Sequence, residues 1–436
     1  MRCVCVSALL ISVLWLSACD AGNPVAQTRA TLHIGVDLPL TGPEGRAATQ
    51  ALNGIRFFIQ RHPTLEGFDV ALSVTDDAQG GNPSPQLGVA NLRKLIADSS
   101  LVSLIGPFDS SVARAEIPIA NAAALAMVSP ATGSPCLTKE IYVPAGLNPA
   151  RTDISCKAAG FPPASELRPT HVNNFFRLST TDDLQGPAAA DYAFRTLHVL
   201  RAAVLSDNEA YGQALADGFT ARFVKLGGSV VGHLDLDPAT APDVTPFFKR
   251  VKSDGARAIF FGGATSSGAC SVRSQMAGVF DAGESTPFLG GDGIAEDPNC
   301  VQDAGTNAPG IYATVPSVDA SSRATASTTI AAFKSAFGNT ADYGPFTMAA
   351  YDATAVDYAA IGRAIRAAGG GEPVRGNVIS QLSVTSGFAG ATGTIGFDPA
   401  GDTTNRLVSI YEPAGADPSL PWKLVDAVDY SAALPY

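Results

Sequence analysis

The chain has 436 residues, of which 46% are hydrophobic and 16% charged, and its formal net charge is −11 at pH 7. This length favours two or three folding units, and an acidic chain without a basic block is a poor candidate for binding nucleic acid. The sequence lacks a phosphate-binding glycine loop, a zinc-binding histidine pair and a nucleophilic serine elbow. We therefore expect a protein that is not an enzyme and needs neither a cofactor nor a metal ion.

The N-terminus has the pattern of an export signal. One arginine precedes an uncharged, largely apolar run over residues 3–16. This run is shorter than the roughly 20 apolar residues of a membrane-spanning helix. It ends in Leu-Ser-Ala-Cys at residues 16–19, which resembles the lipobox of bacterial lipoproteins. An ordinary signal peptide cut near Ala18 or Ala21 is the alternative interpretation.

The lipobox resemblance implies a lipoprotein signal peptide over residues 1–18, diacylation of Cys19 and a polar tether over residues 19–30. Acyl chains hold a protein at a bilayer by burying CH₂ groups, each worth about 0.8 kcal/mol. We therefore expect the mature chain outside the cytoplasmic membrane, in the periplasm or at the cell surface, attached to the membrane through this lipid alone.

The remaining cysteines fit an exported protein. Cys3 and Cys5 would leave with the signal peptide, and an even number remains in the body of the chain. Oxidising compartments favour disulfides, whereas zinc sites usually pair cysteines about two to four residues apart, which these are not. Sequence neighbours are the expected partners. We therefore predict the disulfides Cys136–Cys156 and Cys270–Cys300 rather than a four-cysteine metal site.

The body of the chain alternates short β-rich apolar runs with stretches of helical spacing. This alternation predicts parallel sheets with helices on both faces. In the first set, strands are predicted at 32–36, 70–74, 101–105 and 125–128, and helices at 47–61, 85–98 and 110–124.

A second set with the same alternation begins near residue 174. Its predicted strands are 174–178, 201–205, 229–234, 258–261, 287–289 and 310–315, and its predicted helices are 182–196, 211–226, 244–253, 271–282, 324–337 and 347–367.

Two further stretches do not follow this alternation. The tail from 393 to 411 is predicted to form paired strands around a turn at 398–402. The stretch 139–169 is rich in Pro, Gly and Ala and contains Cys156, and we predict a surface loop held by a disulfide.

Several short segments carry a family resemblance through their order and spacing, although none is specific alone. They are IGVDLPLTGP at 34–43, ALNGI at 51–55, DD at 76–77, IGPFDSS at 105–111, VSP at 128–130, FR at 176–177, DLQGP at 183–187, YG at 211–212 and GG at 262–263. Over almost the whole mature chain they resemble the type I periplasmic binding proteins, specifically the branched-chain amino-acid-binding proteins that feed ATP-driven importers.

The resemblance implies an α/β fold of two doubly wound, Rossmann-like lobes joined by three crossing strands. Lobe one would comprise residues 31–178 and 317–392, and lobe two residues 179–316 and 393–436. The lobes of this family close around a ligand by hinge motion, like a Venus flytrap. The implied function is capture of a small amino-acid-like ligand for the permease of an ABC importer. Ligand sensing for a membrane receptor or regulator is the alternative.

The resemblance also implies an anion site at the start of a predicted helix. Ser110 and Ser111 follow a strand there, where free backbone N–H groups attract negative charge. In the family, the residue matching Ser110 binds the α-carboxylate of the ligand. The alternative is that a serine hydroxyl only caps the helix.

The ligand ammonium is implied to lie between the two lobes. The family places a backbone carbonyl near Ala131, a tyrosine at Tyr211 and an acid at Asp292, which would pair with the ammonium. A threonine hydroxyl is usual at the position of Gly133, so Thr132 or Ser134 would have to supply it, or the hydroxyl is missing. We expect Thr132.

The pocket for the ligand side chain departs from the branched-chain pattern. Ala264 and Thr265 stand where the family often has an aromatic residue after the Gly-Gly pair. Arg46 and Ala47 lie near another usual contact. The identity of the ligand is therefore the least determined part of this interpretation.

Overall fold

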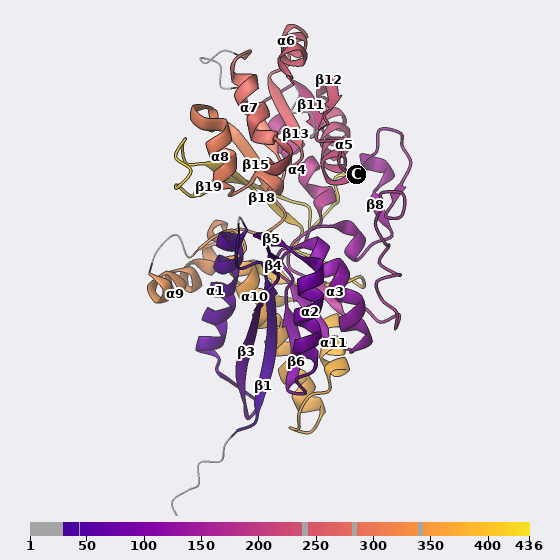
Figure 1. Cartoon of the computed structure of the whole chain (residues 1–436), viewed down its shortest axis with the longest axis vertical. Helices are drawn as coiled ribbons and strands as arrows, with labels where there is room; N and C mark the ends of the chain where they lie inside the picture. The colour runs from indigo at the N-terminus through magenta and orange to yellow at the C-terminus, as the bar shows by residue number, and fades with distance from the viewer. Residues whose placement is uncertain (1–28, 43, 238–242, 281–285, 339–342) are drawn as a thin grey trace, which may run out of the picture.

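The computed structural model describes residues 29–42, 44–237, 243–280, 286–338 and 343–436. Two α/β lobes lie one above the other along the long axis of the molecule (Figure 1). Cys19 and most of the predicted tether lie outside the described residues. Within the described ranges, no helix combines the length and the hydropathy that crossing a bilayer requires.

The first lobe, lower in Figure 1, is built on a sheet with the strand order β10-β7-β6-β1-β3-β2. All neighbouring strands are parallel except β2 and β3. The strands are β1 (Thr31–Leu38), β2 (Thr64–Leu65), β3 (Phe68–Asp76), β6 (Leu101–Ile105), β7 (Ala126–Ser129) and β10 (Phe175–Arg177).

Helices cover both faces of this sheet, which is why its central strands are almost continuously apolar. Ile105 packs with Ile55 in the core on one face, and its neighbour Leu104 packs with Leu92 and Ile117 in the core on the other. The helices are α1 (Gly45–Arg61), α2 (Pro85–Ile96), α3 (Ser110–Ala122), α9 (Ser327–Phe337), α10 (Thr347–Ala367) and α11 (Arg375–Ser383).

The second lobe has a sheet with the order β12-β11-β13-β14-β15-β18-β19. Its first five strands are parallel, and β18 (Leu407–Pro413) and β19 (Trp422–Asp429) continue it in antiparallel fashion. The parallel strands are β11 (Arg201–Ser206), β12 (Ser229–Asp235), β13 (Ala258–Gly262), β14 (Phe288–Gly290) and β15 (Ile311–Val315).

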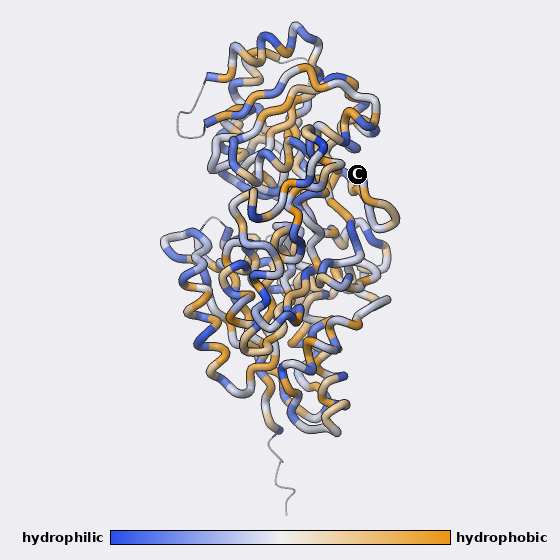
Figure 2. Tube along the Cα trace, turned by 90° about the vertical axis from the view of Figure 1, so that its right-hand side faces the viewer, coloured by the Kyte–Doolittle hydropathy of each residue, from blue (hydrophilic) through white to orange (hydrophobic). Residues whose placement is uncertain are grey.

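The helices of the second lobe alternate with these strands. Along the outer helices of both lobes, apolar and polar positions alternate along the tube (Figure 2), as expected for helices that pack one face on a sheet. The predicted two-lobed α/β fold is confirmed. The helices are α4 (Gln185–Asp191), α5 (Ala210–Lys225), α6 (Thr245–Ser253), α7 (Ala269–Ala277) and α8 (Pro298–Ala304); the predicted end of the 271–282 helix lies outside the described residues.

The C-terminal tail is paired differently from the prediction. The predicted turn at 398–402 is present, since the N–H of Asp398 donates to the Asp402 carbonyl and Phe397 and Thr403 form an antiparallel bridge. The strands differ, because β17 (Gly393–Ile395) pairs with β16 (Phe388–Gly390). β18 (Leu407–Pro413) instead pairs with β15 and with β19 (Trp422–Asp429), a strand that the sequence analysis missed. The predicted pairing of the strands on either side of the turn was wrong, because the free edge of β15 is a distant partner that local spacing does not reveal.

Both predicted disulfides are confirmed. Cys136 bonds to Cys156 and Cys270 to Cys300. The first one holds the stretch 139–169, which contains the antiparallel strands β8 (Ile141–Val143) and β9 (Ile154–Ser155).

This stretch is more than a surface loop. Leu147 and Tyr142 are buried in a cluster with Ala210 and Ala214 of α5 and with the C-terminal Tyr436. In Figure 1 the stretch runs beside α5 of the upper lobe and down to the lower lobe. A segment inserted after β7 of the first lobe therefore packs directly on the second lobe.

Removing the Cys136–Cys156 disulfide is expected to destabilise the protein. The bond closes a loop with a sequence separation of 20 residues, and a loop of that size stabilises a fold by about 3 kcal/mol through the unfolded state. Urea unfolding of a double Cys→Ser variant at these positions measures the loss. The double Cys→Ser variant at Cys270 and Cys300 serves as a comparison; its separation is 30 residues, so its loss should be similar or slightly larger. An unchanged urea midpoint would contradict the prediction.

Candidate ligand-binding cleft

A cavity of about 730 Å³ lies between the two lobes. It opens at the carboxyl ends of parallel strands, where open α/β sheets bind their ligands. Five of the six sequence-predicted site residues line it, and they are Ser110, Ala131, Thr132, Tyr211 and Asp292.

The sixth predicted residue, Ser111, does not line the cavity and has a different role. Helix α3 is capped by Asp109, whose Oδ1 accepts the backbone N–H of Ser111 at 2.6 Å. Capping by a serine hydroxyl is therefore wrong, because an aspartate one residue earlier already satisfies this N–H. The Ser110 hydroxyl remains at the cavity wall, where it accepts the N–H of Ser134 at 3.2 Å.

Thr132 is buried at the same wall and turned toward the end of β7. Its hydroxyl donates to Oγ of Ser129 at 3.0 Å, and its backbone N–H reaches the same oxygen at 3.1 Å. Its carbonyl accepts hydrogen bonds from Arg177 and Ser179. Thr132 thus holds the shape of this loop through both its side chain and its backbone.

Gly133 leaves space that Asp182 fills. A Cβ at position 133 would lie 1.8 Å from Oδ1 of Asp182, and the N–H of Asp182 donates to the Gly133 carbonyl at 2.9 Å. The Asp182 carboxylate therefore occupies the place where the family has a threonine side chain. The sequence analysis missed this residue, although its position in the segment that follows β10, at the start of a predicted helix, was a usable signal.

Replacing Gly133 with alanine is expected to push the Asp182 carboxylate out of position. A backbone-linked methyl in so crowded a place costs about 1–3 kcal/mol of stability, and the affinity for the ligand should fall about tenfold. Thermal unfolding and calorimetric titration measure the two effects. Gly376→Ala in α11 is the control, since the nearest atom to its Cβ would be 3.9 Å away. Equal stability and equal affinity of the Gly133→Ala and Gly376→Ala variants would contradict this account.

Asp292 and Asp182 share a hydrogen-bonding partner from α4. Gln185 donates to Oδ1 of Asp292 at 2.8 Å and to Oδ1 of Asp182 at 3.1 Å. Its Oε1 accepts the N–H of Asp292 at 3.0 Å. Tyr211 donates its hydroxyl to Oδ1 of Asp292 at 2.5 Å. The neutral hydrogen-bond donors Gln185 and Tyr211 thus hold the two carboxylates side by side.

The electrostatic environment of Asp182 and Asp292 favours the binding of a cation. Burial raises the pKa of Asp292, and burial together with the charge of Asp292 raises the pKa of Asp182. Two nearby carboxylates with little water repel each other. A positively charged group placed between them would relieve that repulsion and would gain charge-assisted hydrogen bonds.

Further charged and aromatic side chains line the cavity beyond the predicted set. The Arg114 guanidinium lies over the ring of Phe161, 4.4 Å from its centroid. Phe161 and Tyr142 belong to the stretch 139–169, so this insertion forms part of the cleft wall. The other cavity-lining charged and aromatic residues are Glu44, Arg46, Phe108, Asp109, Glu296, Asp297, Asp303 and Phe346.

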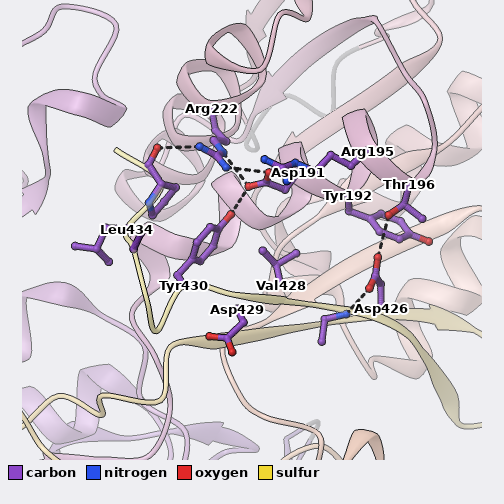
Figure 3. Close-up of a pocket in the computed structure, with 13 residues that line it drawn as sticks. Asp191, Tyr192, Arg195, Thr196, Arg222, Asp426, Val428, Asp429, Tyr430 and Leu434 are labelled. Atoms are coloured by element: carbon purple, nitrogen blue, oxygen red, sulfur yellow. Dashed lines mark hydrogen bonds and ion pairs between the residues drawn. The ribbon is translucent and has the colours of Figure 1, made fainter.

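A second cavity of about 500 Å³ lies in the second lobe, between the end of α4 and the C-terminal tail. Figure 3 shows Arg222 and Tyr430 directed at Asp191. Arg222 donates to both carboxylate oxygens of Asp191, and Tyr430 donates to Oδ2 at 2.6 Å. Arg222 also binds the Pro435 carbonyl. The polar groups of this cavity satisfy one another and fasten the tail, and the cavity contains none of the predicted site residues.

The family model of periplasmic binding proteins matches residues 31–417. The chain belongs to the periplasmic binding protein family. The resemblance inferred from the sequence is thereby confirmed, and the family comprises solute-binding proteins. Among the residues that the structure describes, no group of His, Cys, Asp and Glu side chains could hold a metal ion.

Comparisons place this periplasmic binding protein among receptors with different ligands. It is 27% identical over 386 residues to Leu/Ile/Val-binding protein homolog 3 of Brucella melitensis, covering 88% of this chain and 91% of the relative. The branched-chain amino acid transporter substrate binding protein LivJ of Streptococcus pneumoniae, in complex with isoleucine, superposes with a TM-score of 0.66 at 19% identity, covering 92% of this chain and 99% of LivJ.

A solute binding protein of an R. palustris ABC transporter, in complex with 4-hydroxybenzoate, also gives a TM-score of 0.66, at 20% identity, with 91% and 97% of the two chains covered. At these identities the structural likeness shows the fold alone. The same fold is thus found with an aliphatic amino acid and with an aromatic acid, so the ligand has to be inferred from the cleft.

Proposed function

We propose that this periplasmic binding protein captures an amino acid between its lobes and delivers it to an ABC importer. The observation that carries the proposal is the pair Asp182 and Asp292, held by Gln185 and Tyr211 at one wall of the cleft, with Ser110 and the start of α3 at the other. The first group suits an ammonium and the second a carboxylate. A zwitterion carries both charges on one carbon atom.

Four of the predicted residues, together with Asp182, then have a defined task. Ser110 and backbone N–H groups near α3 receive the α-carboxylate, and the carbonyl of Ala131 and the carboxylates of Asp182 and Asp292 receive the ammonium. Tyr211 lies on the second lobe and binds Asp292. Because the groups come from both lobes, a bound amino acid stabilises the closed arrangement over the open one.

The crossing segments between the lobes would act as the hinge. The chain passes from the first sheet to the second after β10, returns after β15 and passes again before β18. We propose that lobe one (31–178 and 317–392) and lobe two (179–316 and 393–436) move as units about these segments.

A lipid anchor at Cys19 would keep this receptor close to its permease. The proposed tether of residues 19–30 would leave the lobes free to open and close. Replacing Cys19 with alanine in the producing cell is expected to move the protein from the membrane fraction to the soluble fraction. Retention in the membrane fraction would contradict lipidation at this residue.

Calorimetric titration tests the proposed ligand class. A soluble version starting near Asn23 should be titrated with amino acids, with neutral amides and with small dicarboxylates. We expect binding by zwitterionic amino acids and none by amides. Binding of amides or dicarboxylates with no binding of amino acids would overturn the proposal, and so would no binding by any member of the panel.

A further inference from the structure

A second acidic group lies in the cleft, apart from Asp182 and Asp292. Glu44, at the start of α1, and Asp109, at the start of α3, both line the cavity from the first lobe. Asp297, at the start of α8, faces them from the second lobe and contributes to the electrostatic field at Glu44. These carboxylates line the same cavity as Asp182 and Asp292 but come from the starts of three other helices.

Among the described residues, no positive charge or hydrogen-bond donor compensates the Glu44 carboxylate. No described residue donates a hydrogen bond to its carboxylate or forms an ion pair with it. Burial, together with the charges of Asp109, Asp292 and Asp297, raises the pKa of Glu44 to about 7. The surroundings of Glu44 therefore disfavour its ionised form, and a cation bound nearby would favour it.

Only one of the two carboxylate oxygens of Asp109 accepts a hydrogen bond from a described residue. Its Oδ1 accepts the N–H of Ser111, and no hydrogen bond from a described residue reaches Oδ2. Asp297 has the same arrangement, since its Oδ1 accepts the N–H of Asn299. The capping bonds thus fix one oxygen of each carboxylate at the wall of the cavity.

The basic residues of the cleft do not balance these acids. Arg46 faces Glu296, and Arg114 is stacked on Phe161 beside Asp109. The cavity is lined by these two guanidinium groups and by seven carboxylates. An anionic ligand side chain would have to overcome this excess, whereas a cationic one would be attracted.

The apolar part of the same wall also suits a cation. The rings of Phe108 and Phe346 meet edge to face with centroids 5.0 Å apart, and both line the cavity. A cation over an aromatic face gains about 0.5–2 kcal/mol. Ala47 and Ala264 line the cavity as well, and their short side chains leave room for a long ligand.

We propose that the ligand is a basic amino acid whose terminal amino or guanidino group lies between Glu44 and Asp109, with the aromatic pair beneath it. This inference rests on the proposed function and names the class of amino acid. Asp182 and Asp292 bind the α-ammonium, so the ligand meets two acidic groups at its two cationic ends.

Competition between side-chain classes tests the inference. The soluble chain from Asn23 should be titrated with L-ornithine, L-lysine, L-arginine, L-leucine and L-glutamate. At least one basic amino acid should bind about tenfold or more tightly than leucine, and glutamate should bind weakest. Equal or tighter binding of leucine overturns this inference but leaves the proposed function standing. If no amino acid binds, both this inference and the proposed function are overturned.

Two variants test whether Glu44 and Asp109 recognise the side chain of the ligand. Glu44→Gln and Asp109→Asn should each lower the ratio of basic-ligand affinity to leucine affinity about tenfold. Asparagine preserves the helix cap at position 109, and Glu44→Gln removes an opposed charge, so thermal unfolding should show folded proteins. Glu372→Gln, an exposed carboxylate outside the cavity, is the matched control. An unchanged affinity ratio in both variants overturns the assignment.

Discussion

Asp292→Asn is expected to weaken amino-acid binding by about 100-fold or more. The substitution keeps the shape of the side chain but removes the charge that faces the ligand ammonium. Truncating one partner of a buried charge pair costs about 2–5 kcal/mol, and about 2.8 kcal/mol corresponds to a factor of 100. Calorimetric titration with the tightest ligand of the amino-acid panel measures the loss.

The control for Asp292→Asn is Asp417→Asn, which removes a carboxylate in the turn between β18 and β19. Its Oδ1 accepts hydrogen bonds from Ser419, which an asparagine oxygen can also accept. A loss of less than about threefold for Asp292→Asn, comparable to the control, would contradict the ammonium assignment.

Acidification should weaken binding for the same reason. The pKa values of Asp292 and Asp182 are both raised by burial. Their ionised forms attract the ammonium and their protonated forms do not, so affinity should fall as the pH drops through these raised pKa values. In Asp292→Asn the pH dependence should be shallower. A wild-type affinity that rises on acidification would contradict this reasoning.

Arg177→Met is expected to cause the largest loss of stability. The Arg177 side chain is fully buried, and its Nε donates to Oδ1 of Asp402 at 2.7 Å. Its other nitrogens donate to the carbonyls of Thr132 and Ser134 and to the hydroxyl of Thr138. Removing it leaves the Asp402 carboxylate buried without its cation, at a cost of about 3–5 kcal/mol. Urea unfolding measures the difference.

A double variant separates the ion pair from the packing. Arg177→Met combined with Asp402→Leu removes both charges, so it should recover part of the stability that the single variant loses. Although burial opposes ionisation, the charge of Arg177 lowers the pKa of Asp402. This contribution is present above the unfolded-state pKa and is lost as the pH falls through the lower folded value. A single variant that costs less than about 1 kcal/mol would contradict the assignment.

Arg177 also connects stability to binding. It ends β10 at the first passage between the lobes and holds the cleft loop that contains Thr132 and Gly133. Asp182 donates its N–H to that same loop. Loss of Arg177 should therefore loosen the wall of the cleft as well as the core beneath it.

Local sequence patterns determined most of the elements of this protein. The helix α10 (Thr347–Ala367) begins and ends where its spacing predicts, and β1 and β6 follow from short apolar runs closed by glycine and proline. The disulfides followed from the distances between cysteines along the chain. These features depend on interactions within about a dozen residues or on short loops. The order of residues along the chain determines such interactions directly.

The tertiary structure alone decided which distant groups meet. The edge of β15 selects β18 as its partner about a hundred residues later. The Asp182 carboxylate fills the space over Gly133, and the insertion that contains Tyr142 packs on α5 and enters the cleft wall. Such contacts depend on how whole elements pack and on which surfaces remain free, and no local spacing contains that information. For this reason the family and the two lobes could be predicted from the sequence, whereas the second acidic group of the cleft became visible only when the helices α1, α3 and α8 brought their first residues together.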